Sequence, residues 1–121
     1  MNSNEIEQII QSKGLTAPRI TPADIEANIK NEYYFTALDG IVGNEESTDF
    51  DVAYAPDSTR ILTFCVLVLR NGFTVTGESS CASPENFDAE IGRKIARQNA
   101  VSKIWPLLGF ALKQKLHEAA E

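Results

Sequence analysis

The sequence predicts an α+β fold, in which an antiparallel sheet of about three strands is packed by N-terminal helices and by a long C-terminal helix kinked at Pro106. Residues 61–80 contain two β-rich runs separated by Asn71-Gly72, a pair typical of a tight hairpin. The aromatic run at residues 33–36 favours another strand. After the hairpin, apolar residues recur at helical spacing. With 43% hydrophobic content, residues 1–121 should form one domain.

Two helices are expected before the first strand. In residues 1–20, Ser3 can cap a helix that Gly14 would end. This helix is expected to pack either on the body of the protein or on another copy, and the alternative is a frayed peripheral arm. The second helix should begin at Thr21, an N-cap residue followed by proline, and end near Asn31.

Residues 43–59 are acidic and rich in turn formers, and we expect a solvated loop there. Asp49, Asp51 and Asp57 suggest a calcium loop at first sight. The segment lacks the glycine and the terminal glutamate that the usual calcium loop requires. No metal site is therefore expected.

A two-residue turn at Asn71-Gly72 would pair Arg70 with Phe73 and set the register of the hairpin. One face, the expected core face, would then collect Phe64, Val66, Val68, Phe73 and Val75. The other face would collect Cys65, Leu67 and Leu69 with Thr74, Thr76 and Glu78. It is too apolar to be freely solvated, so either another element of the chain or a second subunit should cover it.

The long helix should begin at Ser83-Pro84 or at Asp88. One broad apolar arc is expected to pack on the hairpin: Phe87, Ile91, Ile95, Val101 and Trp105. A stripe of small residues (Ala89, Ala96, Ala100) would let another backbone approach closely. The partly apolar second face of the hairpin and this stripe of small residues together predict a self-association surface. It is made of Leu67, Leu69, Thr74, Ala96 and Ala100.

The net charge of −6 is unevenly distributed. Residues 1–59 carry 3 basic and 11 acidic side chains, a net of −8, whereas residues 60–121 carry 8 basic and 6 acidic ones, a net of +2. An acidic chain without a basic tract is poorly suited to binding along a nucleic-acid backbone. No apolar run is long enough for a membrane span, and no secretory signal is visible. We expect a cytoplasmic protein with both cysteines reduced.

Several motifs resemble those of a family of small tailed-bacteriophage proteins, labelled the phage gene-product-forty-nine/gene-sixty-six family. They are N-G-F-T-V-T-G-E-S from Asn71, N-F-D-x-E-x-G-R-x-x-A from Asn86, and I-W-P-L from Ile104, in that order and spacing. The resemblance covers roughly residues 20–117. It implies a phage accessory protein working in the host cytoplasm. The family is named for where it is found, so no catalytic residues follow from it.

Catalysis is not expected. The single histidine, His117, lies near the end of the last helix and would be a poorly positioned base for a nucleophile. Cys81 precedes a helix start, which can lower a thiol pKa, but no firm base accompanies it. Two cysteines and one histidine are too few for zinc, and no phosphate-binding glycine loop exists. We therefore predict no enzyme, no metal and no cofactor.

The sequence fits non-enzymatic binding better than catalysis. Hydroxyls and free N–H groups near residues 77–86 and the pair Arg93/Arg97 favour a small anionic or nucleotide-like ligand, consistent with a counter-defence role. The predicted ligand-binding residues are Phe73, Thr76, Ser79, Ser80, Ser83, Arg93 and Arg97. The alternative for these arginines is a solvated face, with Glu90 paired to Arg93 or Lys94. The alternative function is an acidic interaction module that binds and inhibits a host protein as a nucleic-acid mimic. Self-association is expected under either function.

Overall fold

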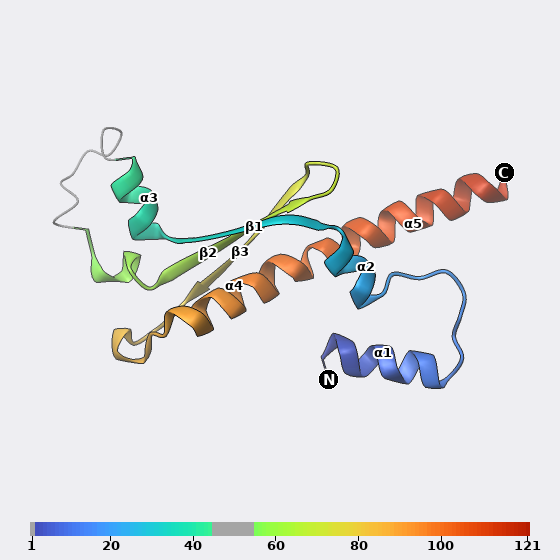
Figure 1. Ribbon diagram of the computed structural model, residues 1–121, viewed down its shortest axis with the longest axis horizontal. Helices are drawn as coiled ribbons and strands as arrows, with labels where there is room; N and C mark the ends of the chain where they lie inside the picture. Colours follow the sequence, from blue (N-terminus) through green and yellow to red (C-terminus); the bar gives the residue numbers. More distant parts are fainter. Residues whose placement is uncertain (1, 45–54) are drawn as a thin grey trace.

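A computed structural model describes residues 2–44 and 55–121 and confirms the α+β class (Figure 1). Most of the predicted acidic loop, including Asp49 and Asp51, lies outside the described residues. None of the helices in the two described segments is long and apolar enough to cross a membrane. The helices and strands are α1 (Ser3–Ser12), α2 (Pro22–Ala27), β1 (Ile29–Thr36), α3 (Ala37–Gly43), β2 (Leu62–Leu69), β3 (Thr74–Ser80), α4 (Ala89–Ser102) and α5 (Ile104–Ala120).

The three strands form one antiparallel sheet in the order β1-β2-β3. The predicted turn between β2 and β3 is wrong by one residue. Gly72 has a φ of +90°, whereas Asn71 does not take the positive φ that a two-residue type I′ turn requires. The N–H of Gly72 donates to the carbonyl of Leu69 at 2.9 Å, and the N–H of Leu69 donates to the carbonyl of Phe73 at 2.8 Å. The loop therefore has three residues.

The longer loop shifts β3 by one residue, which exchanges the faces of its side chains. Val75 lies opposite Leu67, and Gly77 lies opposite Cys65. The face predicted to be solvated or shared is in fact the core: Cys65, Leu67 and Leu69 are buried with Val75. The predicted core face points the other way, and its side chains Phe64, Val66 and Val68 are only half-buried.

Helix α4 lies on the inner face of β2 and β3 (Figure 1). It contacts them with its small residues, because Gly92, Ala96 and Ala100 are buried. The predicted apolar arc is wrong at Ile91 and Ile95, which are 57% and 42% exposed, whereas Val101 and Trp105 pack against the core as predicted. The alanine stripe does admit another backbone, but that backbone belongs to β3 of the same chain.

The predicted self-association surface is therefore also wrong. Leu67, Leu69, Ala96 and Ala100 form the centre of the chain's own core, so they cannot meet a second subunit in the folded protein. Thr74 is exposed on the outer face of the sheet, directly opposite Val68. The choice left open by the sequence is settled in favour of coverage by another element of the chain, helix α4.

Helix α4 approaches so closely because Gly77 has no side chain. A Cβ atom at this position would lie 2.1 Å from the carbonyl oxygen of Ala96 and 2.3 Å from the amide nitrogen of Ala100. Both neighbours are backbone atoms and cannot move aside without moving the helix. The contact between Gly77 and the alanine stripe thus sets the distance between sheet and helix.

The long C-terminal helix bends, as predicted, but at Lys103 rather than at Pro106. A proline clashes with the carbonyl four residues before it, here that of Ser102, and α4 ends at that residue. Pro106 then lies in the first turn of α5. Backbone N–H groups in the first turn make no hydrogen bond within the helix, so a proline there removes none.

The short elements before the hairpin differ in detail from the prediction. The capping box of α2 joins Thr21 and Asp24 as expected, but the helix ends at Ala27 and β1 begins at Ile29. Helix α3 was not predicted. It starts with a capping box in which the N–H of Thr36 donates to Asp39 at 2.8 Å and the hydroxyl of Thr36 accepts from the Asp39 N–H at 3.2 Å.

Helix α1 is attached to the body by an ion pair. The Arg19 guanidinium donates to both carboxylate oxygens of Glu7, at 2.5 and 2.7 Å. Asn2, rather than the predicted Ser3, caps the helix, and Gly14 ends it with a φ of +66°. A cavity of about 270 Å³, lined by residues that include Ile6, Ile10, Arg19, Ile20 and Trp105, separates α1 from the body.

We expect acid to release α1, and Trp105 to report the release, because it is the only tryptophan and lines this cavity. The hydrogen bonds from Arg19 lower the pKa of Glu7 to about 2, well below its usual value of 4.5. A depressed pKa stabilises the docked helix above about pH 4.5, and this contribution is lost as the pH falls towards 2. Trp105 emission should therefore shift to longer wavelength over that range. In Glu7→Gln the shift should already be present at neutral pH. A Glu7→Gln spectrum identical to wild type would contradict this attachment.

Candidate ligand-binding site

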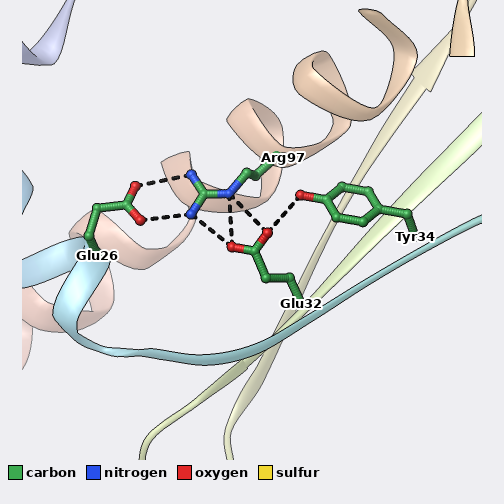
Figure 2. Close-up of polar contacts among 4 residues, drawn as sticks. All are labelled: Glu26, Glu32, Tyr34 and Arg97. Atoms are coloured by element: carbon green, nitrogen blue, oxygen red, sulfur yellow. Dashed lines mark hydrogen bonds and ion pairs between the residues drawn. The ribbon is translucent and has the colours of Figure 1, made fainter. Parts of the chain in front are cut away.

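Arg97, one of the two predicted anion-binding arginines, is already occupied by carboxylates (Figure 2). Its guanidinium donates to both oxygens of Glu26, at 3.0 and 2.7 Å. It also donates to Glu32 from Nε and Nη2, the shortest of these bonds being 3.0 Å. The Tyr34 hydroxyl donates to the second oxygen of Glu32 at 2.9 Å. The cluster joins α2, β1 and α4.

The electrostatics of this cluster suit structure rather than ligand binding. The Glu26 and Glu32 carboxylates raise the pKa of Arg97, and the guanidinium in turn lowers the pKa of Glu32. Burial and the hydrogen bond to Glu32 raise the pKa of the Tyr34 hydroxyl. An incoming anion would have to displace two carboxylates from Arg97. These contacts favour a structural role for Arg97 over the predicted ligand binding.

Arg93, one helical turn before Arg97, has a different environment. Among residues 2–44 and 55–121, it takes part in no ion pair. It lines a cavity of about 140 Å³ where the end of β1, the start of α3 and the first turns of α4 meet. The walls contain three aromatic side chains, two threonine hydroxyls and one carboxylate, from Tyr34, Phe35, Thr36, Asp39, Thr63 and Phe87, with Ala89 beside Arg93.

Two residues that line this cavity, Thr63 and Phe87, lie close to Gly92. A Cβ atom there would lie 3.0 Å from the Thr63 hydroxyl oxygen and 3.5 Å from the Phe87 ring, so glycine leaves both side chains in place. Thr63 is 3% exposed and is the buried polar side chain of the described core. Asp39 holds the N–H of Thr36 with one oxygen. A cation, hydroxyls, aromatic surface and a carboxylate thus converge on one small space.

The remaining predicted residues do not gather around either arginine. Ser79 and Ser80 line a separate cavity of about 100 Å³ with Asp88, Ile91 and Ile95 among its walls. None of the described residues that line it is basic, and the carboxylate of Asp88 disfavours an anion there. Three further predicted residues are exposed and lie apart, at the hairpin tip, on the outer face of the sheet and in the loop before α4: Phe73, Thr76 and Ser83.

The cysteines and the histidine have structural surroundings. Cys65 is fully buried, and burial raises the pKa of its thiol. The Cys81 thiol donates to the carbonyl of Ser83 at 3.1 Å. His117 lies 3.2 Å from Glu121, near the end of α5. Within the described segments, no three His, Cys, Asp or Glu side chains are close enough together to hold a metal ion.

The outer face of the sheet carries aromatic and aliphatic side chains in register. Phe35 stacks on Phe64 with ring centroids 5.5 Å apart. Tyr33, 56% exposed, lies opposite Val66, which in turn lies opposite Thr76 on β3. Helix α4 covers only the inner face, so this outer face is the second candidate surface for binding.

A helix packed on one face of a three-stranded antiparallel sheet, with a mixed polar and aromatic cavity at the end of that sheet, defines a small α+β protein with a candidate binding site. Residues 20–116 match the model of the phage protein (N4 Gp49/phage Sf6 gene 66) family, and the chain belongs to this family. The matched segment contains every residue of the Arg93 cavity, whereas α1 precedes it. No curated protein and no solved structure matches the chain.

The sequence indicates Arg93 and one of its neighbours, because the tyrosines at 33–34 could stack on a base of the ligand. It gives Phe35 no role beyond a strand and places Phe87 in the core, yet both line the Arg93 cavity. Thr63 carried one usable signal, since it is a polar residue that alternates with Ile61 and Cys65 on the buried side of β2. A threonine at such a position either finds a partner in the core or opens onto a cavity.

Proposed function

We propose that this phage protein acts by non-enzymatic binding of a small ligand that joins an anionic group to a flat unsaturated ring, as a nucleotide does. The Arg93 cavity is the binding site. The observation that supports it best is the arrangement of Arg93 beside aromatic walls and the buried hydroxyl of Thr63, while Arg97 is engaged elsewhere. Capture of such a ligand in the host cytoplasm would serve as an accessory, counter-defence role.

The residues suggest how the ligand would lie. Arg93 would hold the anionic group, since a guanidinium donates two parallel hydrogen bonds to a phosphate or carboxylate. Phe35 or Phe87 would contact the ring, and the second oxygen of Asp39 would accept from a ring N–H. The cavity, about 140 Å³, is smaller than the roughly 300 Å³ typical of drug-sized ligands, so one group would enter and the rest would lie over the rim.

Calorimetric titration with a panel of nucleotides and cyclic dinucleotides tests this proposal. Wild type should release or absorb heat with at least one member, and Arg93→Gln should weaken that binding by at least tenfold. Lys94→Gln is the matched control, because it removes the same charge from the next residue of α4, which pairs with Glu90 at 3.2 Å. Absence of heat at millimolar ligand, or equal binding by Arg93→Gln, would contradict the proposal.

The second candidate is binding of a host protein through the outer sheet face, favoured by the exposed ring of Tyr33 and the stacked pair Phe35–Phe64. Recovery of host proteins from lysate at low and at high salt distinguishes two forms of this interaction. A partner lost at high salt indicates charge mimicry by the acidic chain, whereas one retained at high salt and lost in Tyr33→Ser indicates contact with the apolar face.

A further inference from the structure

Helix α5 projects from the body of the protein (Figure 1). Its first turns are anchored, since Ile104 is buried and Trp105 and Leu108 pack against the core. Beyond Leu112 every residue is exposed, including Leu116 at 41%. The projecting half of α5 lacks the packing that usually stabilises a helix. A helix as short as this half would be only marginally stable in water by itself.

The apolar stripe of α5 continues past the point where the body ends. Leu108, Leu112 and Leu116 are spaced by four residues and therefore share one side of the helix. The first two also line an open groove of about 350 Å³, whose opposite wall is formed by Ile20 and Ala27. The stripe thus begins in a groove and ends in solvent.

The exposed end of the stripe points to a missing contact. Leu116 is 41% exposed, and the groove lined by Leu108 and Leu112 is open. A standard protein interface buries about 800 Å² on each partner. A stable dimer therefore has to use the stripe and the groove together.

We infer that two copies of this chain pair through α5, with the projecting stripe of each helix seated against the stripe and groove of the other. A two-fold contact requires a self-complementary surface. The stripe meets this requirement, because it contains both the protruding leucines and the groove that can receive them. The groove carries both signs of charge, from Asp24, Arg70 and Lys115, and so does the outer half of α5. This interface differs from the one that the sequence suggested, and it is independent of the Arg93 cavity.

Sedimentation equilibrium of the full chain tests the inference with two variants of equal charge change. Leu116→Glu places a carboxylate in the proposed interface and should convert a particle of twice 13.3 kDa into one of 13.3 kDa. Gln114→Glu adds the same charge on the other side of α5, about 160° away at 100° per residue, and should leave the dimer intact. Ala119→Glu lies on the stripe, further from the body, and should also dissociate it.

Ala119→Glu keeps the test valid if Leu116→Glu fails to fold, because Ala119 is exposed in the last turn of the helix. Unchanged Trp105 emission would show that either variant retains the body. A wild-type chain that is monomeric at about 100 μM, well above the dissociation constants of stable dimers, would overturn the inference. So would dissociation by Gln114→Glu with the stripe variants still dimeric, since the interface would then lie on the side of Phe110, which is 75% exposed.

Discussion

Replacing Gly77 with alanine should destabilise the protein by about 3 kcal/mol or more, at the upper end of the range for overpacked cores. The added Cβ would lie 2.1 Å from the Ala96 carbonyl oxygen and 2.3 Å from the Ala100 amide nitrogen. Relief requires α4 to move away from β3, which would open the core around Leu67. Urea denaturation followed by circular dichroism measures the loss, as a lower midpoint with an unchanged slope.

Gly109→Ala is the matched control for Gly77→Ala. Gly109 lies inside α5, and a Cβ atom there meets no atom within 4 Å. Alanine should therefore stabilise the helix by about 0.5–1 kcal/mol through its better helix propensity. If Gly77→Ala were as stable as wild type, α4 could not be packed on β3 as closely as described.

Arg97→Met should destabilise the protein by about 1–2 kcal/mol, the range for hydrogen bonds to charged groups, reduced because the cluster is partly exposed. Methionine keeps the length of the side chain but leaves Glu26 and Glu32 without their shared guanidinium. Arg97→Lys should recover only part of the loss, because an ammonium cannot reproduce the planar fork. Thermal or urea unfolding of both variants measures the difference.

Lys94→Met is the control for Arg97→Met, because it removes a cation from the same helix. Lys94 pairs with Glu90 at 3.2 Å, and both side chains are more than two-thirds exposed, so this change should cost at most about 0.5 kcal/mol. A pH series adds a second readout. Arg97 lowers the pKa of Glu32, so the contact between them stabilises wild type at a pH above the usual carboxyl pKa. This stabilisation is lost as the pH falls through the lowered pKa of Glu32. Equal losses in the two variants would show that the Arg97 cluster does not tie α2 and β1 to α4.

The class of fold could be predicted from sequence because it depends on local patterns. The β-rich runs around Asn71-Gly72, the capping box at Thr21 and the helical spacing after the hairpin each specify their own element. Which faces meet could not be predicted. A three-residue loop in place of a two-residue loop shifts β3 by one residue and exchanges the faces of its side chains, and the same apolar pattern fits either register.

The helix face was mispredicted for a related reason. Large apolar residues such as Ile91 and Ile95 usually mark a core face, yet here the buried stripe consists of glycine and alanine. Its partner is Gly77, which lies 19 and 23 residues before Ala96 and Ala100 in the sequence. No local pattern marks Gly77, and it becomes informative only when β3 and α4 are seen together. Close backbone packing depends on β3 and α4 together, and the sequence of neither element alone indicates it.

The candidate site shows the same limit. The spacing of Arg93 and Arg97 correctly predicts that both project from α4, but their roles differ because of Glu26 and Glu32, which lie more than sixty residues earlier in the chain. The ring of aromatic and hydroxyl groups around Arg93 comes from β1, β2 and the loop before α4. Charges paired across such distances in sequence are visible only in the folded protein.

The most direct test of the proposed function is a two-dimensional amide NMR titration with the nucleotide that gives the largest calorimetric signal. Binding in the Arg93 cavity predicts that the largest shift changes fall on Phe35, Thr63, Phe87 and Arg93, and that they vanish in Arg93→Gln. Shift changes centred on Ser79 and Ser80, or on Tyr33 and Val66 of the outer sheet face, would contradict this assignment of the site.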